Sequence, residues 1–190
     1  ALDIAEKIIK RNRRELAAVV VEPIMFNIGC ARPKEGYLKG LKEITITNDV
    51  LLVFDEIISG FRVAPGGAQE YYGVVPDLAT FAKAIANGFP MSAVAGRADV
   101  MEVTRPGGKV GWAGVYNSSQ VCVAASLATL EVLADGEVQR KLNQECADLE
   151  RRFAELAQEE LVTARLQGLG GQFQVYFTDE EVNDYRTAAK

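Results

Sequence analysis

Short apolar runs alternate with stretches of helical periodicity along the first half of the chain. The runs lie at residues 16–21, 50–54, 78–82 and 91–96, and the helical stretches at 1–15, 33–47 and 99–103. Unbroken apolar runs of this length are typical of strands that a parallel sheet buries on both faces. Strands alternating with helices predict right-handed βαβ units. The pattern therefore predicts an α/β fold with a mostly parallel sheet and helices on both faces.

Helical periodicity dominates the second half. Residues 121–133 and 137–158 predict two amphipathic helices. In the second helix, apolar residues recur every three or four positions, which predicts a stripe facing the core. The stripe consists of Leu142, Cys146, Leu149, Phe153 and Leu156. A short strand at 174–177 and a polar segment at 178–190 are expected to follow.

Two charged residues follow two of the predicted strands. Asp55 comes directly after the run at 50–54, and Lys83 directly after the run at 78–82. In open α/β sheets, ligands bind outside the carboxyl ends of the strands. A lysine amine attacks a carbonyl only when it is unprotonated, and removing its proton at pH 7 costs roughly 4–5 kcal/mol for a pKa of about 10.4. The apolar neighbours of Lys83 favour a dry site that would lower this cost.

Asp55 would complement such a lysine by keeping a ring nitrogen protonated. A carboxylate about 4 Å from the cation contributes roughly 4 kcal/mol at an effective dielectric constant near 20. This is about three pKa units, enough to hold a pyridine nitrogen charged at neutral pH. Proteins hold pyridoxal phosphate (PLP) through a lysine Schiff base, or aldimine, and an acid on the pyridinium. The pair therefore predicts a PLP site in which Lys83 also transfers the proton as general base and acid.

Other interpretations of the same residues remain open. A strand ending in Asp-Glu also occurs in P-loop ATPases, but the only Gly-Lys pair, Gly108-Lys109, lies downstream and precedes a valine. Taken singly, Asp55 could be a helix cap, Lys83 a solvated lysine and Asn27 a turn residue. The glycines at 168–171 suggest a dinucleotide fingerprint, but they precede a predicted strand and lack the third glycine, so we reject NAD binding there.

Composition narrows the function classes. Hydrophobic residues make up 48% of the 190 residues, which supports a core, and the net charge of −5 argues against a nucleic-acid partner. The sequence has no histidine, the commonest metal ligand and general base, so no metal site is expected. Cys30, Cys122 and Cys146 are far apart and odd in number, which favours a reduced, cytoplasmic protein. No apolar run approaches 18 residues, so no membrane span is predicted.

Longer segments resemble the class III (fold type I) aminotransferases. Residues 52–63 are similar to the segment that carries the aspartate of the pyridine nitrogen, and residues 66–90 to the stretch leading through the Schiff-base lysine. Residues 22–29 fit the branch of glutamate-1-semialdehyde aminomutase and its aminotransferase relatives. The similarity covers nearly all 190 residues in order. It implies a fold type I large domain that binds PLP.

The resemblance also implies roles for individual residues. Asp55 and Lys83 take the pyridine nitrogen and the Schiff base, while Ile57 packs on the face of the pyridine ring. Asn27 lies near the phenolic oxygen of the cofactor, in a cofactor-binding segment that begins at Glu22.

One stretch departs from the family pattern. Trp112 and Val115 stand at positions that usually hold a histidine and a threonine, and Ser118-Ser119-Gln120 replaces Gly-Asn-Pro. That threonine typically reaches the cofactor phosphate of the neighbouring subunit. Because the valine side chain cannot donate a hydrogen bond, either Ser118 or Ser119 takes over this contact or the affinity for the cofactor is lower.

The resemblance implies an enzyme of amino-group transfer. It would be an aminotransferase of an amino acid and a keto or aldehyde substrate, or an aminomutase that shifts the amine within one molecule. We expect a homodimer with cofactor sites at the subunit interface. The alternative is a non-catalytic relative or fragment serving in assembly, which the departures at Trp112, Val115 and Ser118 favour.

The resemblance implies a division of the chain. Residues 1–133 correspond to the second half of the PLP-binding large domain, and residues 134–190 to a connecting helix and the start of a small α+β C-terminal domain. Family members are roughly twice as long, so we expect the chain to belong to a longer protein. Residues 1–190 alone should then expose apolar surface and be poorly soluble or bind partners.

Overall fold

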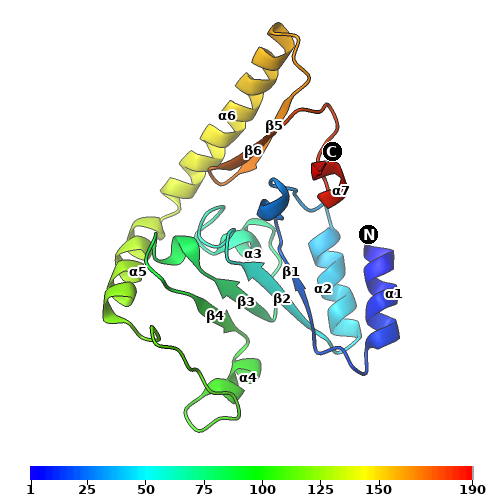
Figure 1. The fold of residues 1–190 in the computed structure, drawn as a ribbon. Helices are drawn as coiled ribbons and strands as arrows, with labels where there is room; N and C mark the ends of the chain where they lie inside the picture. The colour runs from blue at the N-terminus through cyan, green and yellow to red at the C-terminus, as the bar shows by residue number, and fades with distance from the viewer. Residues whose placement is uncertain (190) are drawn as a thin grey trace.

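The computed structural model describes residues 1–189 (Figure 1). The first half contains α1 (Leu2–Asn12), β1 (Ala18–Val21), η1 (Phe26–Ile28), α2 (Tyr37–Thr47), β2 (Leu51–Glu56), α3 (Gly67–Tyr71), β3 (Leu78–Phe81), η2 (Lys83–Ile85) and β4 (Ala93–Gly96). The remainder contains α4 (Ala98–Met101), η3 (Glu102–Thr104), α5 (Gln120–Leu133), α6 (Glu137–Glu159), β5 (Arg165–Leu169), β6 (Gln172–Tyr176) and α7 (Tyr185–Ala188). The η elements are short 3₁₀ helices.

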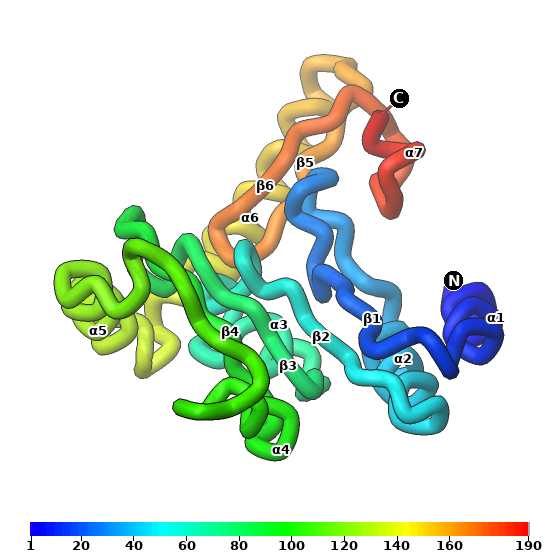
Figure 2. The backbone as a smooth tube through the Cα atoms, turned by 60° about the horizontal axis from the view of Figure 1, so that its bottom comes forward, coloured from blue at the N-terminus to red at the C-terminus, as the bar shows by residue number. Residues whose placement is uncertain are grey.

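The first four strands form one sheet in the order β1-β2-β3-β4. The pairs β1–β2 and β2–β3 are parallel, and β4 runs antiparallel to β3. Figure 2 shows α1 and α2 at the β1 side of this sheet and α5 beyond β4. The predicted α/β fold with a mostly parallel sheet is confirmed.

Helices cover one face of the sheet. Leu52 and Phe54 of β2 are fully buried and share one hydrophobic cluster with Leu38 and Leu41 of α2. The helix α1 packs on α2, and α3 packs against β2. This cluster is the main core of the first half.

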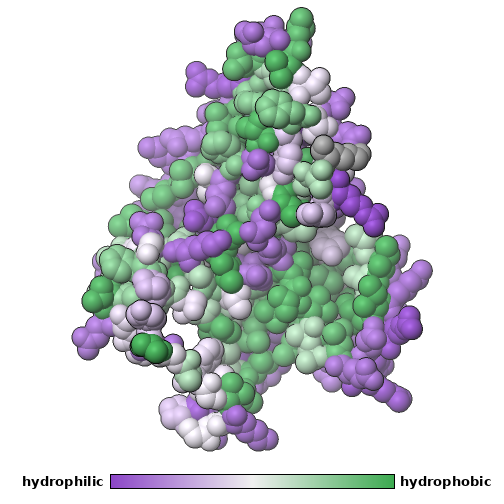
Figure 3. Space-filling model, in the orientation of Figure 1, coloured by the Kyte–Doolittle hydropathy of each residue, from purple (hydrophilic) through white to green (hydrophobic). Residues whose placement is uncertain are grey.

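The opposite face of β2 is less covered. Side chains alternate between the faces of a strand, and Leu51, Val53 and Asp55 are only partly buried. Val20 of the neighbouring strand is 66% exposed, and Figure 3 shows an apolar patch in the region where Figure 1 places the sheet. Within residues 1–189, β2 is therefore buried on one face only, unlike the two-sided burial predicted from its apolar run. This exposed apolar surface agrees with the expectation that residues 1–190 alone leave apolar surface uncovered.

The helix α6 extends from the sheet and packs against β5 (Figure 1). Strands β5 and β6 form an antiparallel hairpin. Gly170 and Gly171 form its turn with φ of 62° and 74°, the conformation that a two-residue hairpin favours. The glycine-rich stretch is thus a hairpin turn and opens no helix. The sequence analysis missed β5 and placed the start of β6 two residues late.

The two long helices occur where the sequence predicts them, but their burial differs from expectation. In α6 the stripe is core-facing only in part, because Cys146 is buried whereas Leu149 and Leu156 are 38% and 54% exposed. The predicted amphipathic character of α5 is wrong, because apolar side chains occur on all faces of this helix. Its exposed apolar side chains are Val121, Val123, Leu127 and Val132.

The hairpin is fastened to the first half of the chain near η1. The Tyr176 hydroxyl donates a hydrogen bond of 2.7 Å to the Ile28 carbonyl oxygen. Gly29 has φ of 88°, and a Cβ atom at this position would lie 1.4 Å from the Tyr176 oxygen. Only glycine fits this approach. None of the helices within residues 1–189 has the length and apolarity needed to cross a membrane.

Candidate active site

The three parallel strands end at the same edge of the sheet. Glu22 follows β1, Asp55 lies next to the end of β2, and Lys83 begins the turn after β3. The register pairs Val21 with Phe54, and Asp55 with Thr80. The structure therefore brings the separately predicted charged residues to one carboxyl edge.

Asp55 is held in a defined orientation. Its Oδ1 accepts hydrogen bonds from the Ile57 backbone N–H at 3.1 Å and from the Thr80 hydroxyl at 3.3 Å. Its Oδ2 accepts no hydrogen bond from residues 1–189. One oxygen is thus fixed by the protein, and the other is free for a cation.

Glu56, the other member of the acid pair, is structural. It is completely buried and accepts backbone hydrogen bonds from Ala68 at 2.5 Å and Gln69 at 3.3 Å, the second and third residues of α3. The Ser59 hydroxyl and the Gln69 side-chain amide donate to it at 2.9 and 3.1 Å. A carboxylate at a helix N-terminus is stabilised by the free N–H groups. The sequence presents Asp55 and Glu56 as one pair, but they point to opposite faces of β2.

Lys83 lies in η2 with a left-handed backbone, φ of 50°. Its side chain is exposed and makes no hydrogen bond or ion pair within residues 1–189. Ile85 turns into the core, whereas Lys83 stays outside because the chain turns immediately after β3. The dry surroundings predicted from its apolar neighbours are therefore not formed by this part of the chain.

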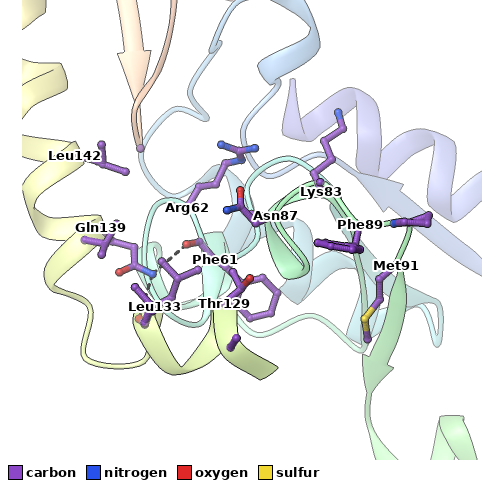
Figure 4. A pocket seen from close by; sticks show the side chains of 17 residues that line it. Phe61, Arg62, Lys83, Asn87, Phe89, Met91, Thr129, Leu133, Gln139 and Leu142 are labelled. Carbon is purple, nitrogen blue, oxygen red and sulfur yellow. Dashed lines mark hydrogen bonds between the residues drawn. The ribbon is translucent and has the colours of Figure 1, made fainter. Parts of the chain in front are cut away.

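A cavity of about 890 Å³ lies beside Lys83 (Figure 4). Its walls come from the loop after β2, from residues 83–91, and from α5 and α6. The polar or charged members of the wall are Arg62, Lys83, Asn87, Thr129 and Gln139. Asp55 does not line it. The cavity therefore extends from the lysine toward the helices, away from the acid.

Backbone strain concentrates at this cavity. Phe61, Lys83 and Asn87 line it, and all three have positive φ, at 62°, 50° and 45°. A left-handed conformation costs a non-glycine residue of order 1–3 kcal/mol and is typical of functional sites. The Gln139 side-chain amide holds Phe61 by donating to its carbonyl oxygen at 3.0 Å. The sequence analysis missed Gln139, which lies 78 positions from Phe61, and no local pattern could have connected them.

The remaining predicted site residues lie at three places. Asn27 donates a hydrogen bond of 3.0 Å to Glu22, so these residues form a pair beyond β1. Ile57 is held against Asp55 through its backbone. Ser118 lies in an exposed segment before α5, and no contact within residues 1–189 joins its side chain to the others. Val115, in the same segment, is 98% exposed.

Comparison with known proteins identifies relatives of this chain. A family model for class-III aminotransferases matches residues 1–190. Glutamate-1-semialdehyde 2,1-aminomutase of Methanocaldococcus jannaschii is 45% identical over 186 residues. This match covers 98% of the chain but only 43% of the length of that relative.

Two solved structures share the fold. An omega-transaminase from Sphaerobacter thermophilus matches with a TM-score of 0.90 and 34% identity, over 98% of this chain and 43% of that one. A glutamate-1-semialdehyde aminomutase variant from Pseudomonas aeruginosa PAO1, in complex with PMP, matches with a TM-score of 0.79 and 28% identity, over 99% of this chain and 43% of that one. The mixed sheet and its helices therefore have the architecture of the PLP fold type I aminotransferases.

Proposed function

The chain belongs to the class-III aminotransferase family, and on that premise we propose that it carries the cofactor-binding lysine of a PLP-dependent amino-group transfer enzyme. The observation that carries this proposal is the placement of Asp55 and Lys83 at the ends of neighbouring parallel strands. Asp55 keeps one oxygen free, and Lys83, which has no hydrogen-bond partner within residues 1–189, lines a cavity.

The donor set fits PLP. When bound, PLP supplies an aldehyde that reacts with amines and a ring that accepts electrons from the substrate carbon. Lys83 offers the amine, and the free oxygen of Asp55 would accept a hydrogen bond from the protonated ring nitrogen and keep it charged. Ile57 lies next to Asp55 and would pack on the ring. The pair formed by Asn27 and Glu22 would face the phenolic oxygen.

Lys83 is also the residue that moves the proton. With the cofactor in place, Lys83 would act first as the base that takes the proton from the substrate carbon and then as the acid that gives a proton back. Transamination and an intramolecular amine shift need the same two residues. We therefore propose an amino acid as amine donor, with a keto acid or aldehyde as its counterpart, and keep the aminomutase reaction as the other member of this class.

The assembly follows from the same premise. We place the enzyme in the cytoplasm as a homodimer with cofactor sites between subunits, residues 1–133 belonging to the large domain and 134–190 to the connection and the small domain. The exposure of Ser118 and Val115 supports a segment that meets another subunit. There Ser118 would replace the threonine that donates to the cofactor phosphate.

A second candidate function is a non-catalytic relative that serves in assembly. The observation in its favour is the segment at 112–120, where Val115 cannot donate a hydrogen bond to phosphate. This candidate retains the fold but predicts no covalent attachment of PLP.

Covalent trapping on full-length protein separates the two candidates. PLP is added, the absorption band of the lysine adduct is recorded, and borohydride reduction is followed by peptide mass spectrometry. We expect the label on Lys83 in the wild type and in Lys39→Ala, an exposed-lysine control on α2. Lys83→Ala should lose both band and label. A band that persists in Lys83→Ala contradicts the assignment, and a wild type without a band favours the assembly function.

Substrate assays then distinguish the two reactions of the first candidate function, the aminomutase and the aminotransferase reaction. The protein is given glutamate-1-semialdehyde alone, or an amino donor together with a keto acid. Turnover of the single substrate indicates the aminomutase reaction, and turnover that requires both indicates the aminotransferase.

A further inference from the structure

Gln139 of α6 is a polar side chain buried in the wall of the cavity beside Lys83. It is 2% exposed. Its amide donates hydrogen bonds to the carbonyl oxygens of Phe61 at 3.0 Å and Leu133 at 3.3 Å (Figure 4). Its Oε1 has no hydrogen-bond partner within residues 1–189. Because a buried acceptor without a donor costs stability, core packing does not explain this residue, whereas the two groups that its amide holds do.

Asn143 holds the same loop one helical turn further along α6. Residues four apart lie on one face of a helix, and the Asn143 amide donates to the Val63 carbonyl oxygen at 2.9 Å. Its Oδ1 accepts the Gly170 N–H of the hairpin turn at 3.0 Å. The turn packs closely on the loop, since a Cβ atom at Gly170 would lie 2.9 Å from the Val63 side chain. We call Gln139 and Asn143 the amide clamp.

The loop held by the amide clamp contacts the strand end that carries Lys83. Phe61 has a left-handed φ of 62°, and its ring centroid lies 5.3 Å from that of Phe81, the last residue of β3. Gly60 also approaches Phe81 closely, because a Cβ atom there would lie 2.7 Å from the ring. The turn η2 then begins at Lys83, whose φ is 50°. Direct contacts therefore connect α6, through the loop, to the turn of Lys83.

We propose that Gln139 and Asn143 are positioning residues for Lys83. They fix the loop at 61–63, and through the ring contact between Phe61 and Phe81 they set where the lysine meets the cofactor. The inference rests on the proposed function for the identity of the group that Lys83 meets. A left-handed residue persists only where its surroundings support it, and a reacting group must be held within about 0.5 Å of its productive position. The amide clamp supplies this support from α6.

Amide hydrogen exchange on cofactor-free full-length protein tests this coupling without any reaction. Gln139→Met keeps an unbranched side chain of similar size but removes both hydrogen-bond donations. It should speed exchange about tenfold in the turn at 83–87, where two backbone N–H groups donate to the Lys83 carbonyl oxygen. The rates are measured relative to the β1 amides, which report global unfolding. Gln144→Met, the same change at an exposed position of α6, is the matched control and should exchange like the wild type.

Asn143→Asp is the second variant. It removes the donor to the Val63 carbonyl oxygen but keeps the acceptor for the Gly170 N–H, so the hairpin stays attached while the loop is released. Exchange at 83–87 should rise in this variant as well, about threefold. If Gln139→Met does not fold, Asn143→Asp decides alone.

Cofactor attachment is measured in parallel, as the PLP concentration that half-saturates the borohydride label on Lys83. We expect this concentration to rise about tenfold in Gln139→Met and in Phe81→Leu, which removes the ring contact. In the double variant the rise should be no larger than in either single variant, because both changes interrupt the same contacts.

Unchanged exchange at 83–87 in both clamp variants would overturn the proposal, even if urea unfolding showed a loss of global stability. Effects of Gln139→Met and Phe81→Leu that multiply in the double variant would also overturn it. A wild type without a label on Lys83 rejects the proposed function separately, because the exchange measurement needs no cofactor.

Discussion

The charged side chains at the two ends of the parallel strands differ in how they are paired. We call the sides of the sheet where these strands begin and end the amino edge and the carboxyl edge. At the amino edge, Asp77 is buried, and its Oδ2 accepts the Leu52 N–H at 2.8 Å. Its Oδ1 pairs with Lys42 at 2.8 Å and with Arg97 at 3.0 Å. At the carboxyl edge, Asp55 keeps one oxygen free, and Lys83 has no partner among the described residues.

The difference separates stabilising charges from charges available to a ligand. A buried ion pair that loses one member is strongly destabilising, because the other member remains without compensation. Unpaired groups at an exposed edge contribute little to folding and can pair with a substrate or cofactor. We therefore expect substitutions at the amino edge to change stability and substitutions at the carboxyl edge to change chemistry.

The largest effect is expected from Asp77→Ala. The change leaves the Leu52 N–H and the Lys42 ammonium without their acceptor, and should lower the free energy of unfolding by about 3–5 kcal/mol. Urea unfolding followed by circular dichroism measures it. Asp179→Ala, in the segment after β6, is the control and should change stability far less. A loss below about 1 kcal/mol for Asp77→Ala would remove the contrast between the edges.

Asp55→Asn tests the other edge. The amide keeps the shape of the side chain but not its charge, so the unfolding free energy should stay within about 0.5 kcal/mol. Loss of roughly 3–4 kcal/mol of stabilisation at the ring nitrogen should lower the rate of amino transfer about 10²- to 10³-fold. The measurements are single-turnover kinetics and urea unfolding on the same preparation. An unchanged rate would show that Asp55 does not act on the cofactor ring.

Glu56→Gln tests whether Glu56, although adjacent to Asp55 in the sequence, has a structural role. The buried amide of glutamine would face the N–H groups of Ala68 and Gln69 with a donor where an acceptor is needed. We expect a loss of about 1–3 kcal/mol in unfolding free energy. Glu43→Gln, the same change at an exposed position of α2, should have little effect. Equal losses for both variants would contradict the structural role of Glu56.

The smallest effect expected is a pH dependence. Burial alone would raise the pKa of Asp77, but the Leu52 N–H, Lys42 and Arg97 together lower it below the ordinary value. The unfolded state therefore binds the proton first as pH falls. The stability from Asp77 is present above its unfolded pKa of about 3.9 and is lost as pH falls through the folded pKa. Acid titration of stability should show this loss in the wild type and not in Asp77→Asn.

The sequence predicted the charged residues at the carboxyl edge of the sheet but not those at the amino edge. An apolar run ending in Asp55, and another ending in Lys83, were enough to predict strands, their parallel pairing and a ligand site at their carboxyl ends. The role of Asp77 was not predicted, because its partners are far apart in the sequence: Leu52 lies on β2, Lys42 on α2, and Arg97 between β4 and α4. The left-handed φ of Phe61 and the anchor from Gln139 were invisible for the same reason.

The sequence by itself determined the order of the four sheet strands and of the long helices, since local periodicity decides which residues can be buried in each element. It also determined the family, through the residues at 52–63 and 66–90. Only the tertiary structure decided which face of β2 is covered, which acid of the Asp55-Glu56 pair stays free, and that Gln139 and Asn143 hold the loop after β2. These properties depend on contacts between segments far apart in the chain, and no local pattern records such contacts.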